Sequence, residues 1–92
     1  MTDADKVTML KVDLGITTTA YDERLENYLQ TARKMMAREG VVLTQDDAET
    51  VDDINLNIMY AAWLWRKRDT GEGMPRMLRW ELNNRVFDLK QD

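Results

Sequence analysis

The chain has 92 residues, a formal net charge of −4, and hydrophobic residues at 43% of its positions. This length supports one domain with a single core, and this composition is that of a globular protein rather than a disordered one. One proline and four glycines are too few for the many turns of a β-sandwich.

Cysteine and histidine are both absent. Their absence excludes disulfides and thiolate chemistry, and it removes the usual general base, nucleophile and transition-metal ligand. The sequence also lacks a glycine-rich phosphate loop and a Ser/His/Asp set. We therefore expect no catalytic residue, no cofactor and no metal, and a protein that is not an enzyme. A carboxylate-only enzyme is a remaining alternative, and it would need a pocket with paired acids.

No membrane or targeting segment is expected. The longest apolar run covers eight residues, 58–65, whereas a transmembrane helix needs about 20. Residues 1–5 are acidic and lack the apolar centre of a signal peptide.

The first apolar stripe predicts a helix over 3–14. Gly15 follows as a suitable C′ residue, with Ile16 as the apolar contact after it. The stripe has the helical spacing of three and four residues and consists of Val7, Leu10 and Leu14.

A second helix is predicted over 20–39, ending at Gly40. Thr18 or Thr19 is the expected N-cap, and Thr19 has capping-box spacing to Asp22. The expected apolar face consists of Tyr21, Leu25, Tyr28, Leu29, Ala32, Met35 and Met36. The β-prone segment 41–44 is too short for a sheet of its own, so it is interpreted as an extended linker, with strand pairing between subunits as the alternative.

The third predicted helix, over 46–68, is apolar on nearly all sides. One stripe consists of Ala48, Val51, Ile54, Ile58, Ala62 and Trp65, and a second of Leu56, Met59, Tyr60, Trp63 and Leu64. Such a helix must be buried all round. It is either the central helix of a bundle, or a helix whose second stripe is buried against another subunit.

The fourth helix is predicted over 75–89, with Pro75 in its first turn after a turn that contains two glycines. Its expected inner stripe consists of Met74, Leu78, Leu82, Val86 and Leu89. Together the four segments predict an all-α fold, a single bundle-like domain over residues 1–92.

An acidic cluster opens the predicted third helix: Asp46, Asp47, Glu49, Asp52 and Asp53. A helix-loop-helix calcium site needs alternating acids around a central glycine, which is missing here. Acids in a first helical turn are favoured by the helix dipole alone, and we adopt that interpretation.

Five cations flank the turn between the last two helices: Arg66, Lys67, Arg68, Arg76 and Arg79. The first three suit a helix C-terminus. The alternative is a local basic patch that contacts phosphate.

Three tryptophans, Trp63, Trp65 and Trp80, are many for this length. Trp63 and Trp65 point to different sides of a helix because they are about 200° apart. Core filling is the simplest role for all three. Tryptophan is also enriched in interface hot spots, and Trp63, on the second stripe, is the better interface candidate.

Charge is unevenly divided along the chain. Residues 1–53 carry twelve acids and six bases, and residues 54–92 carry five acids and seven bases. The two halves can attract each other, within one chain or between neighbouring copies. The predicted interface between copies therefore combines part of the second stripe with two bases: Leu56, Met59, Tyr60, Trp63, Arg76 and Arg79.

The order and spacing of these segments resemble the head-tail connector (adaptor) proteins of tailed phages. The segment 9–16 resembles their short first helix ending in Leu-x-Ile, and Asp22, Leu25, Leu29 and Ala32 match their second helix. The segments 65–69 and 74–76 fit the basic end of their long helix and the Met-Pro start of the last. The resemblance covers about 9–87.

This resemblance implies a structural role in a phage or prophage product. Such proteins form a ring, commonly of twelve subunits, under the portal at the capsid vertex. The ring extends the DNA channel and docks head-closure or tail proteins. The implied location is the head–tail junction of the virion, reached from the host cytoplasm during assembly.

The alternative function is a small helical DNA-binding regulator. Arg76, Arg79 and Asn83 on the fourth helix would then face the groove. The acidic net charge disfavours this alternative, and we expect no tight binding of duplex DNA.

Overall fold

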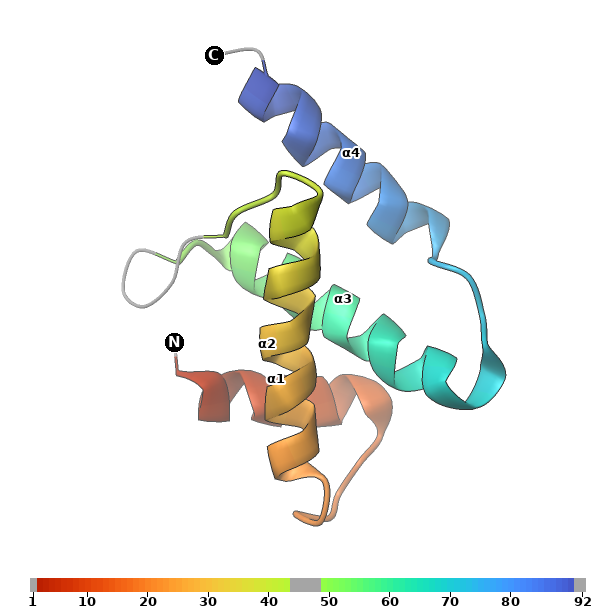
Figure 1. Cartoon of the computed structure of the whole chain (residues 1–92). Helices are drawn as coiled ribbons and strands as arrows, with labels where there is room; N and C mark the ends of the chain where they lie inside the picture. The colour runs from red at the N-terminus through yellow and green to blue at the C-terminus, as the bar shows by residue number, and fades with distance from the viewer. Residues whose placement is uncertain (1, 44–48, 91–92) are drawn as a thin grey trace.

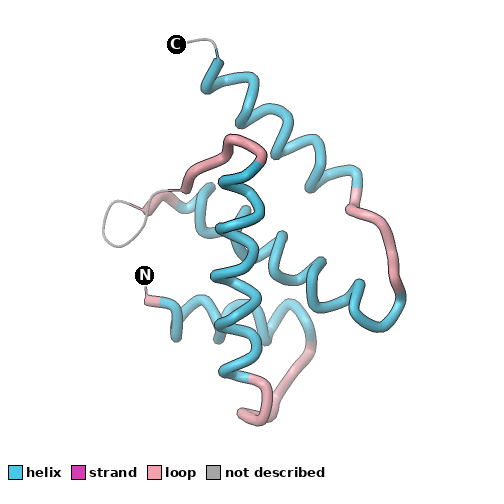
Figure 2. Tube along the Cα trace, viewed as in Figure 1, coloured by secondary structure: helices cyan, strands magenta, loops and turns pink. Residues whose placement is uncertain are grey.

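Four helices form the regular structure in a computed structural model of the chain, which describes residues 2–43 and 49–90 (Figure 1). They are α1 (Asp3–Leu14), α2 (Asp22–Arg38), α3 (Val51–Thr70) and α4 (Arg76–Lys90). The described residues contain no strand, and loops connect the helices (Figure 2). The predicted all-α fold of four helices is confirmed.

The core lies among α1, α2 and α3, each of which contacts the other two. In Figure 1, α2 crosses in front of both α1 and α3. Helix α4 packs mainly against α3, and it contributes the buried side chains of Leu78 and Leu82. The buried faces of the first two helices consist of Val7, Leu10, Leu25, Leu29, Ala32 and Met36.

The ends of α1 follow from local side-chain and backbone chemistry. Thr2 is the N-cap, and its hydroxyl accepts from the Asp5 N–H at 3.1 Å, while the Asp5 carboxylate accepts from the Thr2 N–H. This capping box satisfies two backbone donors that a helix start leaves open. Gly15 ends the helix at φ 72°, where a side chain would be strained, and Ile16 N–H donates to Lys11 O. The predicted helix end is therefore confirmed.

Helix α2 is shorter than the predicted 20–39, and its predicted cap is wrong. Tyr21 is the N-cap and makes no side-chain capping bond. The Thr18 hydroxyl instead accepts from the Ala20 N–H at 3.2 Å. The Asp22 N–H donates to the backbone oxygen of Thr19. Threonine here holds the turn before the helix, a use that competes with capping.

Helix α3 begins at Val51, five residues later than predicted, and extends to Thr70. The Thr50 hydroxyl accepts from the Asp53 N–H at 3.1 Å and so fixes this start. Residues 44–48, which include Thr44, Asp46, Asp47 and Ala48, lie outside the described residues. Residues 41–43 have no regular structure, as the linker interpretation predicts; Val41 and Leu43 are buried.

Helix α4 begins at Arg76, directly after Pro75, whose oxygen accepts from the Arg79 N–H. Of its predicted inner stripe, Leu78 and Leu82 are buried and Met74 and Val86 pack partly buried against the core. The side chain of Leu89 lies outside the described part. None of the described helices is both long and apolar enough to cross a membrane.

Candidate interaction surface

The second apolar stripe of α3 is mostly inside the chain. Leu56, Tyr60 and Trp63 are buried, and only Met59 is partly accessible, with 38% of its surface exposed. The prediction that Leu56, Tyr60 and Trp63 are exposed at an interface between subunits is therefore wrong, because their side chains are buried within the chain. The cause is the central position of α3, which α1, α2 and α4 all contact. The alternative prediction, in which α3 is the central helix of the bundle, accounts for the burial of these residues.

Trp63 anchors the connection between α3 and α4. Its indole N–H donates to the backbone oxygen of Glu72 at 3.3 Å, and the Tyr60 ring packs edge-on at 5.4 Å. The Lys67 ammonium group lies 4.6 Å from the centre of the Trp63 ring. These contacts satisfy the polar end of a buried indole, so Trp63 belongs to the core.

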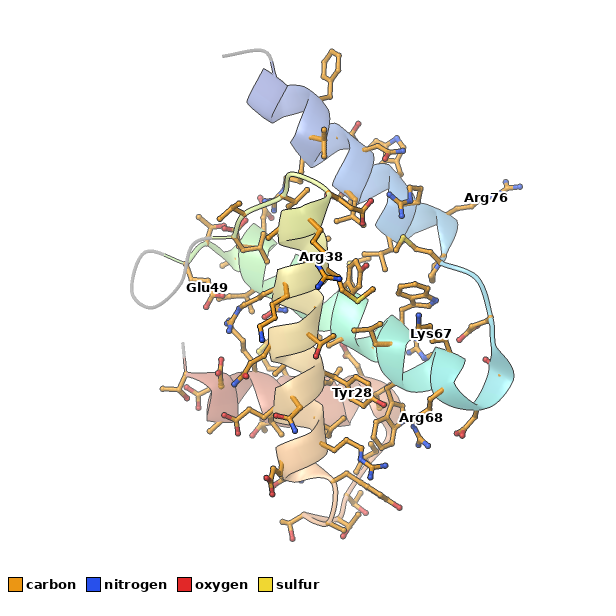
Figure 3. All side chains as sticks on the ribbon, in the orientation of Figure 1. Tyr28, Arg38, Glu49, Lys67, Arg68 and Arg76 are labelled. Atoms are coloured by element: carbon orange, nitrogen blue, oxygen red, sulfur yellow. The ribbon has the colours of Figure 1, made fainter. Side chains whose placement is uncertain are left out.

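Trp65 lies on another side of α3, as the spacing predicts. Its half-buried ring packs edge-on against Tyr21 at 5.3 Å and Tyr28 at 6.0 Å, and the Arg68 guanidinium lies 3.9 Å from its centre. Figure 3 shows Tyr28 and Arg68 on this side of the molecule. The aromatic cluster fixes the loop before α2 against the end of α3.

The five predicted cations have different surroundings, and Arg66 is exposed near the end of α3. Lys67 and Arg68 lie over tryptophan rings, and Arg79 pairs with Glu39 at 2.5 Å. Arg76 is exposed and extends away from the bundle at the start of α4 (Figure 3). Of the two bases predicted at an interface, Arg76 therefore stays accessible, and Arg79 already has a partner.

An ion pair links α4 to the start of α3, and a buried tyrosine on α3 has a raised pKa. The Arg85 guanidinium lies 2.6 Å from the carboxylate of Asp53, which is buried. Burial raises the pKa of the Tyr60 hydroxyl, the Glu39 carboxylate raises it further, and Arg79 lowers it. The Arg85–Asp53 pair holds α4 against the start of α3.

The opposite side of α4 exposes three large apolar side chains. Met77 is 66% exposed, Trp80 58% and Phe87 61%. They lie opposite the buried Leu78 and Leu82 at 100° per residue. We call these three residues the outer stripe. Sequence reasoning assigned Trp80 to the core, although its spacing from Met77 and Phe87 already placed all three on one helix face.

Sequence reasoning also missed a buried charged cluster between α1 and the start of α3. Lys6 pairs with Glu49, and neither side chain is exposed. Arg33 on α2 lies 3.7 Å from Glu49 and 3.3 Å from Asp3. Within the described residues, no group of three or more acidic side chains is placed to hold a metal ion. The cluster connects α1, α2 and the segment before α3 through ion pairs.

Comparison with known proteins gives no relative to report. No family model matches the chain, and neither a curated protein nor a solved structure matches it.

Proposed function

We propose that the protein is a structural subunit of the head–tail junction of a tailed phage or prophage. It assembles as a ring under the portal, extends the DNA channel, and docks head-closure or tail proteins. The pattern of residues over 9–87 supports the proposal, as does an all-α fold with the helix order that the pattern implies.

The observation that carries the proposal is the outer stripe. A large aromatic side chain exposed beside two further apolar ones is costly in water, and such patches are typical of protein–protein contact sites. Because α4 is held mainly by α3, its outer side is open along the helix. A protein whose function is assembly requires a surface of this kind.

Charge also favours assembly over DNA recognition. The chain has a net charge of −4, which suits a channel through which DNA slides without being held. In the regulator alternative, Arg79 would contact the groove, yet its guanidinium pairs with Glu39. We therefore favour the connector over the regulator.

Electron microscopy of the portal tests this proposal. The purified chain is mixed with the portal ring of the genome that encodes it, and particles are imaged in negative stain. We expect an added ring of density on the tail side of the portal. Portal particles without added density at saturating protein would contradict the proposal.

A matched pair of variants makes the test specific to α4. Trp80→Ala removes the largest member of the outer stripe, whereas Val12→Ala shortens an apolar side chain on α1 that is even more exposed. We expect the added density to weaken with Trp80→Ala and to persist with Val12→Ala. Equal densities for the two variants would exclude the outer stripe as the docking surface.

A further inference from the structure

The outer stripe has the spacing of a coiled coil. Met77, Trp80, Asn84 and Phe87 are separated by three, four and three residues. This is the a–d–a–d pattern of two consecutive heptads, with Met77 and Asn84 at a and Trp80 and Phe87 at d. The three apolar members are exposed and Asn84 is partly exposed. Helix α4 therefore presents a seam with no partner among the described residues.

The rest of the chain lies on the far side of this seam. In the same heptads the buried Leu78 is at b and Leu82 at f, positions that face away from a and d. Figure 1 shows α4 along the outer edge of the molecule, with α3 on one side of it. Another helix can thus lie along the seam without meeting α3.

The flanking charges indicate what kind of helix fits. Arg76 is at g and Glu81 is at the e position five residues later. In a parallel pair, each g residue meets the e residue five positions on in the other helix. Two identical α4 helices would therefore form the Arg76–Glu81 contact twice. Neither side chain has an ion-pair partner within the described part of the chain, so both are available.

Asn84 supplies the third observation. An asparagine at a single a position specifies register and a two-stranded state, at a cost in stability. Its amide carries both donor and acceptor, so it can bond to the same residue of a second copy. In a seam made otherwise of Met, Trp and Phe, this polar residue favours an identical partner in register.

We infer that two copies of this chain associate through parallel packing of their α4 helices, with the outer stripes and Asn84 on the dimer axis. The flanking charges are complementary to a second copy. The inference does not rest on the proposed function. The dimer covers the same stripe that the connector uses, so docking and dimer formation compete.

Sedimentation velocity of the purified chain tests the dimer directly. We expect a concentration-dependent dimer whose dissociation constant rises about tenfold or more with Trp80→Ala. Val12→Ala is the control, and it should leave the dissociation constant unchanged. Circular dichroism of both variants should show unchanged helix content. A chain that stays monomeric at every concentration, or equal dissociation constants for the two variants, would overturn the inference.

Charge exchange tests the contact between the flanks. Arg76→Glu and Glu81→Arg should each weaken the dimer, and the double variant should restore it because the pair is rebuilt with opposite signs. A double variant as weak as the singles would refute the assigned contact. All these measurements omit the portal, so their failure leaves the ring experiment intact, and the reverse also holds.

Cross-linking tests the orientation. The chain has no cysteine, so Met77→Cys introduces a single thiol per copy. In a parallel pair the two copies of residue 77 lie next to each other. Mild oxidation of the Met77→Cys variant by itself should therefore give a covalent dimer. An antiparallel pair would instead cross-link Met77→Cys only with Phe87→Cys in a mixture, and that result would overturn the parallel arrangement. Binding of a monomeric chain to vesicles of anionic lipid, lost with Trp80→Ala, would replace the dimer with a membrane contact.

Discussion

The Lys6 ammonium group and the Glu49 carboxylate form an ion pair that is closed to solvent on both sides. Lys6 Nζ also lies 3.5 Å from the side-chain oxygen of Asn57, whose amide nitrogen donates to Leu29 O at 3.0 Å. One lysine thus connects α1 with the segment before α3, with α3 and, through Asn57, with α2. Removing one partner of such a pair leaves a buried charge without compensation.

Lys6→Met should therefore lower the free energy of unfolding by about 3 kcal/mol. Urea unfolding followed by circular dichroism measures the change. Lys34→Met is the control, because Lys34 is exposed on α2, and it should change the free energy by less than about 0.5 kcal/mol. Combining Lys6→Met with Glu49→Leu should recover much of the loss, since it removes the buried carboxylate that would otherwise keep only the longer contact with Arg33. Equal effects for the two lysines would contradict the burial of the pair.

The two tryptophans Trp63 and Trp80 should differ sharply in their effect on stability. Trp63→Ala empties a buried, hydrogen-bonded site and should cost about 3–5 kcal/mol. Trp80 is mostly exposed, so Trp80→Ala should change the free energy of unfolding by less than about 1 kcal/mol. Urea unfolding at low protein concentration, where association is absent, separates the two. A large loss with Trp80→Ala would place it in the core.

The raised pKa of Tyr60 should make the free energy of unfolding depend on pH in the alkaline range. Its pKa in the folded chain is raised above the usual value of 10.0. Below that value both states keep the proton, and stability does not depend on this group. Above it the unfolded chain loses the proton first, so the free energy of unfolding falls as pH rises. Tyr60→Phe should make this fall shallower in urea titrations at a series of alkaline pH values, and parallel profiles would refute the role of Tyr60.

Duplex DNA should not bind the chain tightly at physiological salt. The acidic net charge and the engagement of Arg79 by Glu39 leave few cations for phosphate contacts. An electrophoretic mobility shift should show no complex, and replacing both Arg76 and Arg79 by alanine should not alter the result. Salt-sensitive binding at sub-micromolar protein that this double variant abolishes would favour the regulator.

Local sequence signals specified the four helices and the start of α1, but they misplaced the starts of α2 and α3. Glycine at a left-handed end is a strong signal, and Gly15 ends α1 as predicted. Threonine is ambiguous because its hydroxyl bonds equally well inside a turn, as Thr18 does, or at a cap, as Thr50 does. The start of α3 was misplaced because acids ahead of a helix resemble acids in its first turn.

The candidate surface was harder to predict because it depends on which helix lies at the centre. The sequence pattern of an apolar stripe on α3 is the same whether a neighbouring helix or another subunit covers the stripe. In the structure, other parts of the same chain bury Trp63. Lys6 and Glu49 are 43 positions apart in the sequence, so no local sequence pattern predicts their pairing. Trp80 could have been assigned to the surface by comparing the two faces of its own helix.

The attachment of α4 mainly to one helix has a consequence for how the chain opens. Helices α1, α2 and α3 support one another, whereas α4 is connected through the 71–75 loop and one packed face. Such a segment forms a cooperative unit of its own, with a smaller opening free energy than the rest. Its amide hydrogens should exchange with solvent before those of α2 without global unfolding. A partner bound to α4 should slow the exchange of these amide hydrogens, so their protection measures whether a partner is bound to the helix.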